Sequence, residues 1–202
     1  ALFPETYEQS RERFRNNLPV VQSMWPQAKV FQHKLAGEED LTVDWIYSEA
    51  LETNEKILLF TTGEHGVEGY VGSAMLQRFV EIYMPKLDPR KTGIVVVYAF
   101  NPWGMKHHRR GTAKNVDLNR TFIWNDGFDP TFNPDYDKIH TFLSPASTVK
   151  NIAVDNLKYM VGLFWHIVRM GMRNFRYALL LGQYRHPQGL YYGGTETPEE
   201  TR

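Results

Sequence analysis

The segment KILLFTTGEHGVEGYVGSAMLQRFVEIY, residues 56–83, decides the fold class. It opens with the apolar run KILLFTT at 56–62, of the kind that is buried on both faces of a sheet. A second such run, GIVVVYAF, follows at 93–100, and we expect both runs to be central strands. Between them, residues 68–83 carry apolar side chains at helical spacing: Val71, Met75, Phe79 and Ile82. A strand, a helix and a strand in this order indicate parallel pairing and an α/β fold.

The flanking sequence adds a hairpin and further helices. Residues 29–35 and 41–47 are short, partly alternating segments separated by the polar run 36–40, which predicts an antiparallel hairpin. Residues 159–181 form the most apolar stretch, with too many charged or titratable side chains for an ordinary membrane span. We interpret them as one or two buried helices, broken near Gly171. No repeat or linker interrupts the chain, so we expect a single domain.

The composition excludes several classes of function. The 202 residues include 23 Lys plus Arg and 23 Asp plus Glu, so no net charge attracts nucleic acid or a membrane surface. There is no cysteine, which excludes disulfides and thiolate metal sites. Residues 1–15 resemble an amphipathic helix and lack the apolar core of a secretory signal. We therefore expect a cytoplasmic protein with neither a nucleic acid nor a membrane as partner.

Polar side chains gather in the two loops that follow the predicted parallel strands. In open α/β sheets, ligands bind beyond the carboxyl ends of the strands, and the loops beginning at Gly63 and Asn101 leave from that edge. Both loops carry more polar side chains than a connection needs: Glu64, His65 and Glu68 in the first, and His107, His108, Arg109, Arg110, Asp117, Asn119 and Arg120 in the second. Position and chemistry together predict a functional site at this edge.

His65 and Glu68 form a His-x-x-Glu pair directly after the first strand, among glycines that let the backbone turn. Imidazole and carboxylate groups suit zinc, with ligand bonds of ~2.0–2.2 Å. The alternative is a helix start at which Glu68 favours the helix dipole. The pair alone does not decide between the two, because the chain has seven histidines and many glutamates.

A second set of motifs favours the metal site. Asn101-Pro102-Trp103-Gly104, then Arg109-Arg110, then Val116-Asp117-Leu118-Asn119-Arg120 follow in order. With these motifs the chain resembles the zinc metallocarboxypeptidases, the family of pancreatic carboxypeptidase A, whose pattern is His-x-x-Glu, Asn-Pro-x-Gly, an arginine and Asp-x-Asn-Arg. It is more similar still to a bacterial branch known chiefly as a domain of unknown function, through GEHGVEG at 63–69, the arginine pair, and GQY at 182–184 leading to GLYYGG at 189–194.

The resemblance implies a fold and a metal site. The fold would be a mixed, mainly parallel central sheet flanked by helices, in a three-layer α/β/α arrangement. His65 and Glu68 would be zinc ligands, and Asp117 would orient the His65 ring. Residues 1–202 would be a single domain that corresponds to the N-terminal two-thirds of the family domain.

The resemblance also implies how substrate is held. Arg110, with its neighbour Arg109 as second choice, would polarise the scissile carbonyl and stabilise the oxyanion. Asn119 and Arg120 would bind the free carboxylate of the substrate, to which a guanidinium makes a planar, bidentate contact. The alternative for these arginines is a solvated basic turn.

Two parts of the resembled family's site are not matched before Arg202: a histidine as third zinc ligand and a catalytic glutamate. We therefore expect the chain to be incomplete at its C-terminus; a second chain that completes the site, or a truncated non-enzyme, is the alternative. His140, followed by Thr141, superficially matches the third-ligand motif. It comes too early in the family order, within a predicted helix at 136–143, and we reject it.

The implied activity is zinc-dependent hydrolysis of a C-terminal peptide bond, or a related amide, next to a free carboxylate. The substrate would be a peptide or an acylated amino acid. One alternative is an aspartoacylase-like deacylase of N-acyl amino acids, a related branch that shares the Gly-x-His-Gly-x-Glu turn. The other is an inactive binding module that retains the fold.

Overall fold

The structure, a computed structural model, describes residues 2–37, 40–123 and 127–202. Residue 1 of the predicted N-terminal helix and two residues of the predicted turn at 36–40 lie outside this part. The chain divides into two compact units, which are described separately: unit 1 comprises Ala1–Ala113 and Glu199–Arg202, and unit 2 comprises Lys114–Pro198. The expectation of a single domain stays a prediction.

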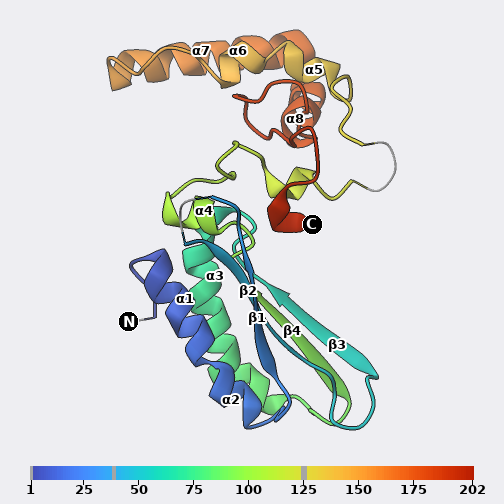
Figure 1. The fold of residues 1–202 in the computed structure, drawn as a ribbon. Helices are drawn as coiled ribbons and strands as arrows, with labels where there is room; N and C mark the ends of the chain where they lie inside the picture. Colours follow the sequence, from blue (N-terminus) through green and yellow to red (C-terminus); the bar gives the residue numbers. More distant parts are fainter. Residues whose placement is uncertain (1, 38–39, 124–126) are drawn as a thin grey trace. The chain divides into compact units, whose positions relative to one another are not determined.

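Unit 1 contains a four-stranded mixed sheet in the order β1-β2-β4-β3 (Figure 1). Its strands are β1 (Lys29–Lys34), β2 (Thr42–Ser48), β3 (Lys56–Thr61) and β4 (Thr92–Tyr98). The predicted hairpin is confirmed, because β1 and β2 pair antiparallel. The parallel pairing of β3 with β4 is confirmed as well. The expectation of a mainly parallel sheet is wrong for the described strands, since β2 joins β4 antiparallel and only β3–β4 is parallel.

Helices α1 (Tyr7–Asn16), α2 (Leu18–Gln22) and α3 (Gly69–Arg78) lie against one face of this sheet (Figure 1). Helix α1 begins where the Thr6 side chain accepts a hydrogen bond from the Gln9 amide, a standard N-cap. Below the helices, Ile94, Val96 and Tyr98 of β4 are almost fully buried. Burial of an aliphatic side chain such as Ile94 or Val96 contributes about 1.5–3 kcal/mol to the stability of the fold. The covered face of the sheet is therefore the core of unit 1.

The opposite face of the sheet exposes apolar side chains, and this changes the interpretation of β3. Ile57 and Leu59 of β3 are 65% and 64% exposed, whereas Leu58 and Phe60 pack on the core. Among the described strands, β3 is an edge strand and is half covered. Its prediction as a central strand buried on both faces is wrong; for β4 the prediction is confirmed.

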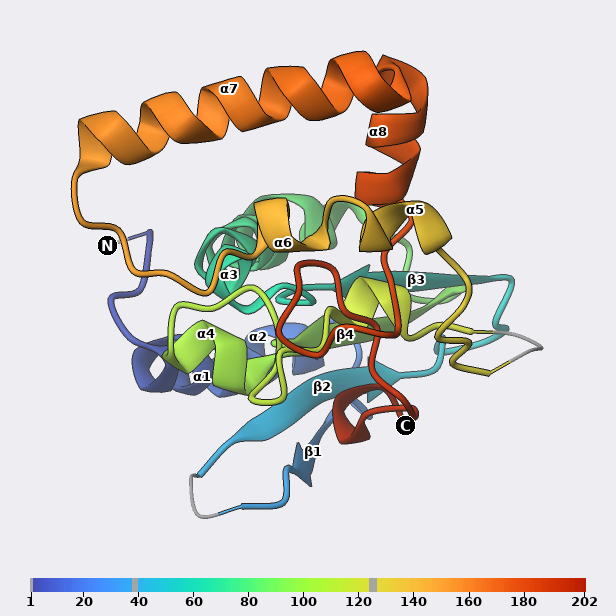
Figure 2. The same cartoon turned by 90° about the horizontal axis from the view of Figure 1, so that it is seen from above.

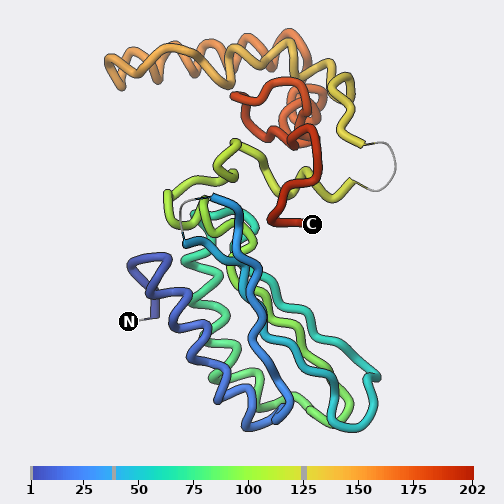
Figure 3. Tube along the Cα trace, viewed as in Figure 1, coloured from blue at the N-terminus to red at the C-terminus, as the bar shows by residue number. Residues whose placement is uncertain are grey.

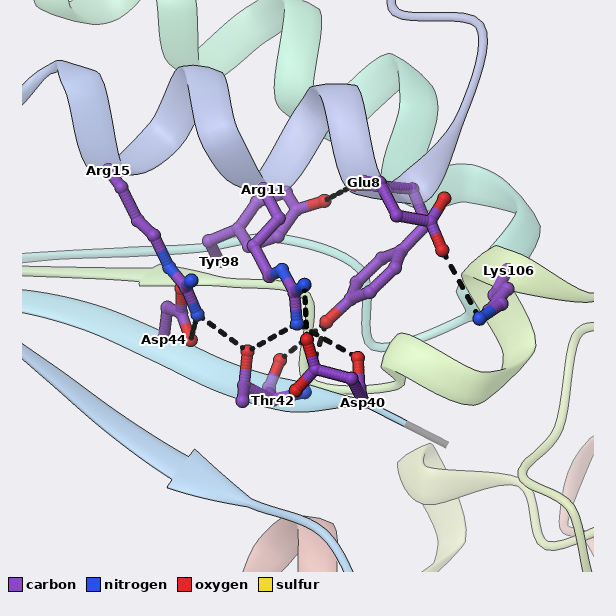
Figure 4. A network of polar contacts seen from close by, with 9 residues as sticks. Glu8, Arg11, Arg15, Asp40, Thr42, Asp44, Tyr98 and Lys106 are labelled. Carbon is purple, nitrogen blue, oxygen red and sulfur yellow. Dashed lines mark hydrogen bonds and ion pairs between the residues drawn. The ribbon is translucent and has the colours of Figure 1, made fainter. Parts of the chain in front are cut away.

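An ion-pair network fixes α1 to β2 (Figure 4). The Arg15 Nε donates to Asp44 Oδ2 at 2.6 Å, and the Asp44 side chain is fully buried. One turn earlier, Arg11 pairs with Asp40 at 2.8 Å, but that carboxylate is exposed. The Arg11 guanidinium holds the pKa of Asp40 below its usual range. Two arginines of one helix thus make a buried and an exposed ion pair.

Helix α3 continues through a π-helical turn, η2 (Phe79–Tyr83), and a 3-10 turn, η3 (Met84–Lys86). The predicted helix at 68–83 is therefore confirmed. Its apolar stripe, however, does not mark the buried face, because Val71 and Met75 are exposed while Ser73 and Leu76 are buried. The Ser73 hydroxyl is buried against Ser10 of α1, with the two oxygens 2.6 Å apart.

Unit 2 is helical: α5 (Pro134–Asp137), α6 (His140–Leu143), α7 (Ile152–Met170) and α8 (Met172–Leu180), preceded by the short turn η4 (Leu118–Arg120). Its small core consists of Ile139, Phe175 and Ala178, with partly buried side chains of α6 and α7 around them. Asn133 stabilises this unit from inside, since its amide donates to the carbonyls of Ala178 at 2.9 Å and Gly182 at 2.8 Å.

The predicted helices at 159–181 exist and are broken at Gly171, which adopts a φ of +78° between α7 and α8. Figure 2 shows α8 turning away from α7 at this point. Their predicted burial is wrong for α7, which has no buried residue. Among the described residues, no helix combines the length and apolar character needed to cross a bilayer.

Candidate functional site

The site lies where β3 and β4 end at the same edge of the sheet (Figure 3). The ladder continues briefly past both strands, because the Asn101 amide donates to the Gly63 carbonyl at 2.8 Å. Gly63 has a φ of +69°, and a Cβ there would lie 2.8 Å from Ala99 Cα. Only glycine fits this turn without strain. The local sequence thus directs residues 64–68 away from the sheet.

Asn101 organises the second loop. Its side-chain oxygen accepts from the Gly104 amide at 2.8 Å and caps α4 (Pro102–Lys106). The same side chain donates to the Arg110 carbonyl at 3.1 Å. Gly104 in turn accepts from the Arg109 amide at 2.7 Å. Asn101 is fully buried, so these contacts fix the path of residues 101–110.

The two loops are joined through their backbones. The Gly66 amide donates to the Arg110 carbonyl at 3.2 Å, and the Val67 amide donates to the Arg109 carbonyl at 3.0 Å. A Cβ at position 66 would lie 2.0 Å from the carbonyl carbon of Gly104, so glycine is required for this approach. The consequence is that both arginines emerge directly beside the His-x-x-Glu turn.

The structure brings together three of the predicted site residues. The His65 Nδ1 and Glu68 Oε1 atoms are 3.3 Å apart, and Arg110 Nη1 lies 3.5 Å from the same Glu68 oxygen. Arg109 is exposed and carries no such contact among the described interactions, which favours Arg110 of the pair. Glu68 makes no side-chain capping hydrogen bond to α3, although it occupies the N-cap position.

The separation of the His65 and Glu68 atoms fits a shared metal ion. Two ligands of a tetrahedral zinc, with bonds of ~2.0–2.2 Å, lie ~3.3–3.5 Å apart. The His65 side chain is mostly buried, at 11% exposed, while Glu68 reaches solvent at 63%. Within the described ranges, no group of three His, Asp or Glu side chains is arranged to hold a metal. Two donors of suitable type and spacing are therefore present.

A pocket of about 250 Å³ opens on this pair. It is lined by Thr61, Thr62, Gly63, Glu64, His65, Glu68 and Gly72. The sequence had placed Glu64 among the polar loop residues without a role, and the two threonines and Gly72 were not anticipated. For Thr62 the sequence does offer a signal. It is the last residue of the apolar run 56–62, and a residue at the end of a strand lies at the edge of the sheet where the pocket opens.

The remaining predicted residues lie in unit 2. Asp117 is buried, and its carboxylate accepts from the Asn119 amide at 3.1 Å, which caps η4. The Arg120 guanidinium donates to the carbonyls of Asn119 at 2.9 Å and Leu180 at 2.7 Å. Its Nε is buried without a hydrogen-bond partner in the described part of the chain. The roles of these three residues towards the His65 pocket stay predictions.

The histidines outside the motif contact other rings. His107 packs on Trp103 at 4.6 Å between ring centroids, and His108 stacks on Tyr70 at 5.4 Å. In unit 2, His140 stacks on His186 at 3.9 Å. Burial lowers the pKa of His140, and the neighbouring His186 lowers it further. His140 thus takes part in an aromatic contact at the start of α6.

The solved structures that match this chain include two of low similarity. The "Putative carboxypeptidase A" of Shewanella denitrificans OS-217 is 20% identical over 57% of this chain and 32% of that chain, with a TM-score of 0.38. The "putative carboxypeptidase" of Burkholderia mallei ATCC 23344 is 21% identical over the same shares, with a TM-score of 0.39. The chain thus spans about a third of the length of these two proteins.

No curated protein matches the sequence. A family model does match, and it covers residues 3–201, nearly the whole chain. The chain therefore belongs to the family described as "Protein of unknown function (DUF2817)".

Proposed function

We propose that this chain carries part of the active site of a zinc-dependent hydrolase, which cleaves a C-terminal peptide bond or a related amide next to a free carboxylate. The observation that supports this most directly is the 3.3 Å separation of His65 Nδ1 and Glu68 Oε1 in a pocket beyond the end of β3. The ordered motifs that resemble zinc metallocarboxypeptidases, of which this pair is the first, support it as well.

His65 and Glu68 would hold the zinc ion. The bound ion would supply an acidified water, with a pKa of ~7, and would polarise the scissile carbonyl. A third protein ligand and a general base are also needed for such a site. The proposal therefore concerns the metal-binding half of the site and leaves the assembly of the other half to experiment.

Arg110 would stabilise the negative charge that develops on the carbonyl oxygen. Its guanidinium lies beside Glu68, and the backbone contacts of Gly66 and Val67 hold its loop in place. By analogy with oxyanion donors, a cation held beside the scissile carbonyl would lower the barrier by ~3 kcal/mol.

Asn119 and Arg120 would bind the free carboxylate of the substrate, and Asp117 would orient the His65 ring. The buried, unpartnered Nε of Arg120 is consistent with a guanidinium that can take a further acceptor.

Zinc binding tests the metal site directly. The purified chain is dialysed against zinc, and its bound metal is measured by elemental analysis and titration calorimetry. We expect His65→Ala and Glu68→Ala to weaken zinc binding by about 10-fold or more while the far-UV circular dichroism stays unchanged. His33→Ala, which removes an exposed histidine of β1, is the matched control and should retain the metal. Equal zinc content in all variants would contradict the assignment.

Substrate assays separate the candidate functions. A carboxypeptidase cleaves a peptide with a free C-terminus and ignores its amide; a deacylase prefers an N-acyl amino acid. Arg120→Ala should lower kcat/KM for the free acid by about 10-fold or more. In the complete protein, metal binding without turnover of either substrate class would instead favour the binding module.

A further inference from the structure

Helix α7 presents a broad apolar surface to solvent. Six of its side chains, which we call the α7 stripe, lie on one face and are strongly exposed: Val154 (47%), Leu157 (66%), Val161 (62%), Phe164 (71%), Trp165 (60%) and Val168 (62%). Contiguous apolar surfaces of this kind mark interaction sites in soluble proteins. The α7 stripe therefore needs a partner.

The other face of α7 is apolar as well, and it is already in use. Leu163, Ile167 and Met170 pack on the core of unit 2, and Gly162 lies against the Phe142 ring. A helix that is apolar on both faces is one that is buried on both. Within unit 2 only one face of α7 is covered, so the opposite face is available for a second contact.

The spacing of the α7 stripe points to another helix as the second contact. Val154, Leu157, Val161, Phe164 and Val168 are separated alternately by three and four residues. This is the heptad spacing of helices that pack side by side. All five side chains at these positions are apolar, as the core of such a helix pair requires.

The exposed area is close to what a stable dimer needs. With full side-chain areas of roughly 150–250 Å², the six exposed fractions amount to about 700 Å² per copy. A standard protein interface buries about 800 Å² per partner. The helix itself, at 19 residues, is about 28 Å long, which is enough for three turns of continuous contact.

The helix dipole favours a copy of the same helix in antiparallel orientation. Antiparallel pairing places the positive N-terminal end of each helix beside the negative C-terminal end of the other, which is an attractive arrangement. The charged side chain at the N-terminal end does not oppose it, because Asp155 is paired with Lys158 of its own helix at 3.6 Å. We propose that α7 is the dimer interface of this protein, and that two copies pack antiparallel through the α7 stripe.

A lipid surface is the main competing occupant. Helices that lie in a membrane interface have a strongly charged or polar face opposite the apolar one. The face of α7 opposite the stripe is apolar and packed, and the chain has no net charge to attract anionic lipid. The second copy fits these observations better.

Light scattering and analytical ultracentrifugation test the dimer. The wild-type chain should have twice the 23.6 kDa mass of one chain at micromolar concentration. Phe164→Glu and Val161→Glu should raise the dimer dissociation constant by at least about tenfold, because each places a charge at the centre of the interface. Ile57→Glu makes the same change at an equally exposed apolar position of β3 and should leave the dimer intact. Circular dichroism checks that each variant is folded.

Cysteine crosslinking tests the orientation, since the chain contains no cysteine of its own. Val161→Cys, near the two-fold axis, should form a disulfide-linked homodimer under mild oxidation. Val154→Cys should crosslink efficiently only when mixed with Val168→Cys. Efficient self-crosslinking of Val154→Cys would mean a parallel pair and would overturn the antiparallel arrangement.

Three results would overturn the proposal as a whole. These are a monomeric wild-type chain at about 100 µM, a concentration that populates even a dimer of micromolar affinity, a dimer unaffected by Phe164→Glu, or a dimer dissociated by Ile57→Glu. Flotation with vesicles of anionic phospholipid, abolished by Phe164→Glu in a chain that stays monomeric, would assign the stripe to lipid instead.

Discussion

Replacing Asp44 by alanine tests whether the fold of unit 1 depends on the buried ion pair between α1 and β2. Asp44 is fully buried, and Arg15 contacts both of its oxygens, through Nε at 2.6 Å and Nη2 at 3.3 Å. Breaking a buried pair by removing one partner costs about 3–5 kcal/mol. The Arg15 side chain is 32% exposed, so water screens part of the loss. We therefore expect a cost of about 3 kcal/mol, at the lower end of that range.

Arg11→Ala is the matched control, because it removes the other arginine pair of the same helix. Its partner Asp40 is 70% exposed, and exposed pairs contribute little to stability. Urea unfolding followed by circular dichroism gives both free energies of unfolding, and the double variant Arg15→Ala/Asp44→Ala gives the coupling of the buried pair. If Asp44→Ala cost no more than Arg11→Ala, burial would not be the reason for the strength of the pair.

Three further predictions concern the site loops and unit 2. Gly66→Ala should separate the two loops, because its Cβ would lie 2.0 Å from the Gly104 carbonyl carbon; we expect about 2–3 kcal/mol of lost stability in urea and weaker zinc binding. Asn133→Ala should cost about 2–3 kcal/mol, measured the same way, because two buried carbonyls lose their donor. His140 has a lowered pKa, so the unfolded chain takes up more protons below pH 6.5 and stability should fall as the pH falls. His140→Phe keeps the ring contact and should flatten the dependence of the thermal midpoint on pH; an unchanged slope would exclude His140 as its source.

The sequence predicted those parts of the fold that depend on local patterns. The hairpin and the parallel strands followed from runs of seven or eight residues, whose apolar pattern can be recognised without the rest of the chain. The sheet order did not follow, because β2 pairs with β4 across about fifty residues and no local pattern encodes that partner. The spacing of apolar residues also failed to predict the buried face of α3. Ser73 is buried through a polar contact with Ser10, and a pattern of apolar residues cannot indicate such a contact.

The candidate site was predictable where side-chain chemistry defines it. His65, Glu68 and Arg110 were predicted from residue type, order and the family resemblance. The structure places the three side chains together, and their roles stay predictions. The hydrogen bonds that join the two loops could not be predicted from the sequence, because they use backbone amides and carbonyls, which almost every residue possesses. The glycine at 66 was the only trace of them in the sequence.

The joining of the two loops by backbone hydrogen bonds has a consequence for how this site can change. The amides of Gly66 and Val67 donate to the backbone carbonyls of Arg110 and Arg109. These hydrogen bonds do not depend on which side chains positions 109 and 110 carry. Other residues can stand there while the pocket keeps its shape. Chemistry and scaffold are thus separately adjustable: replacing Arg110 removes its guanidinium from Glu68, while the backbone joint between the two loops remains.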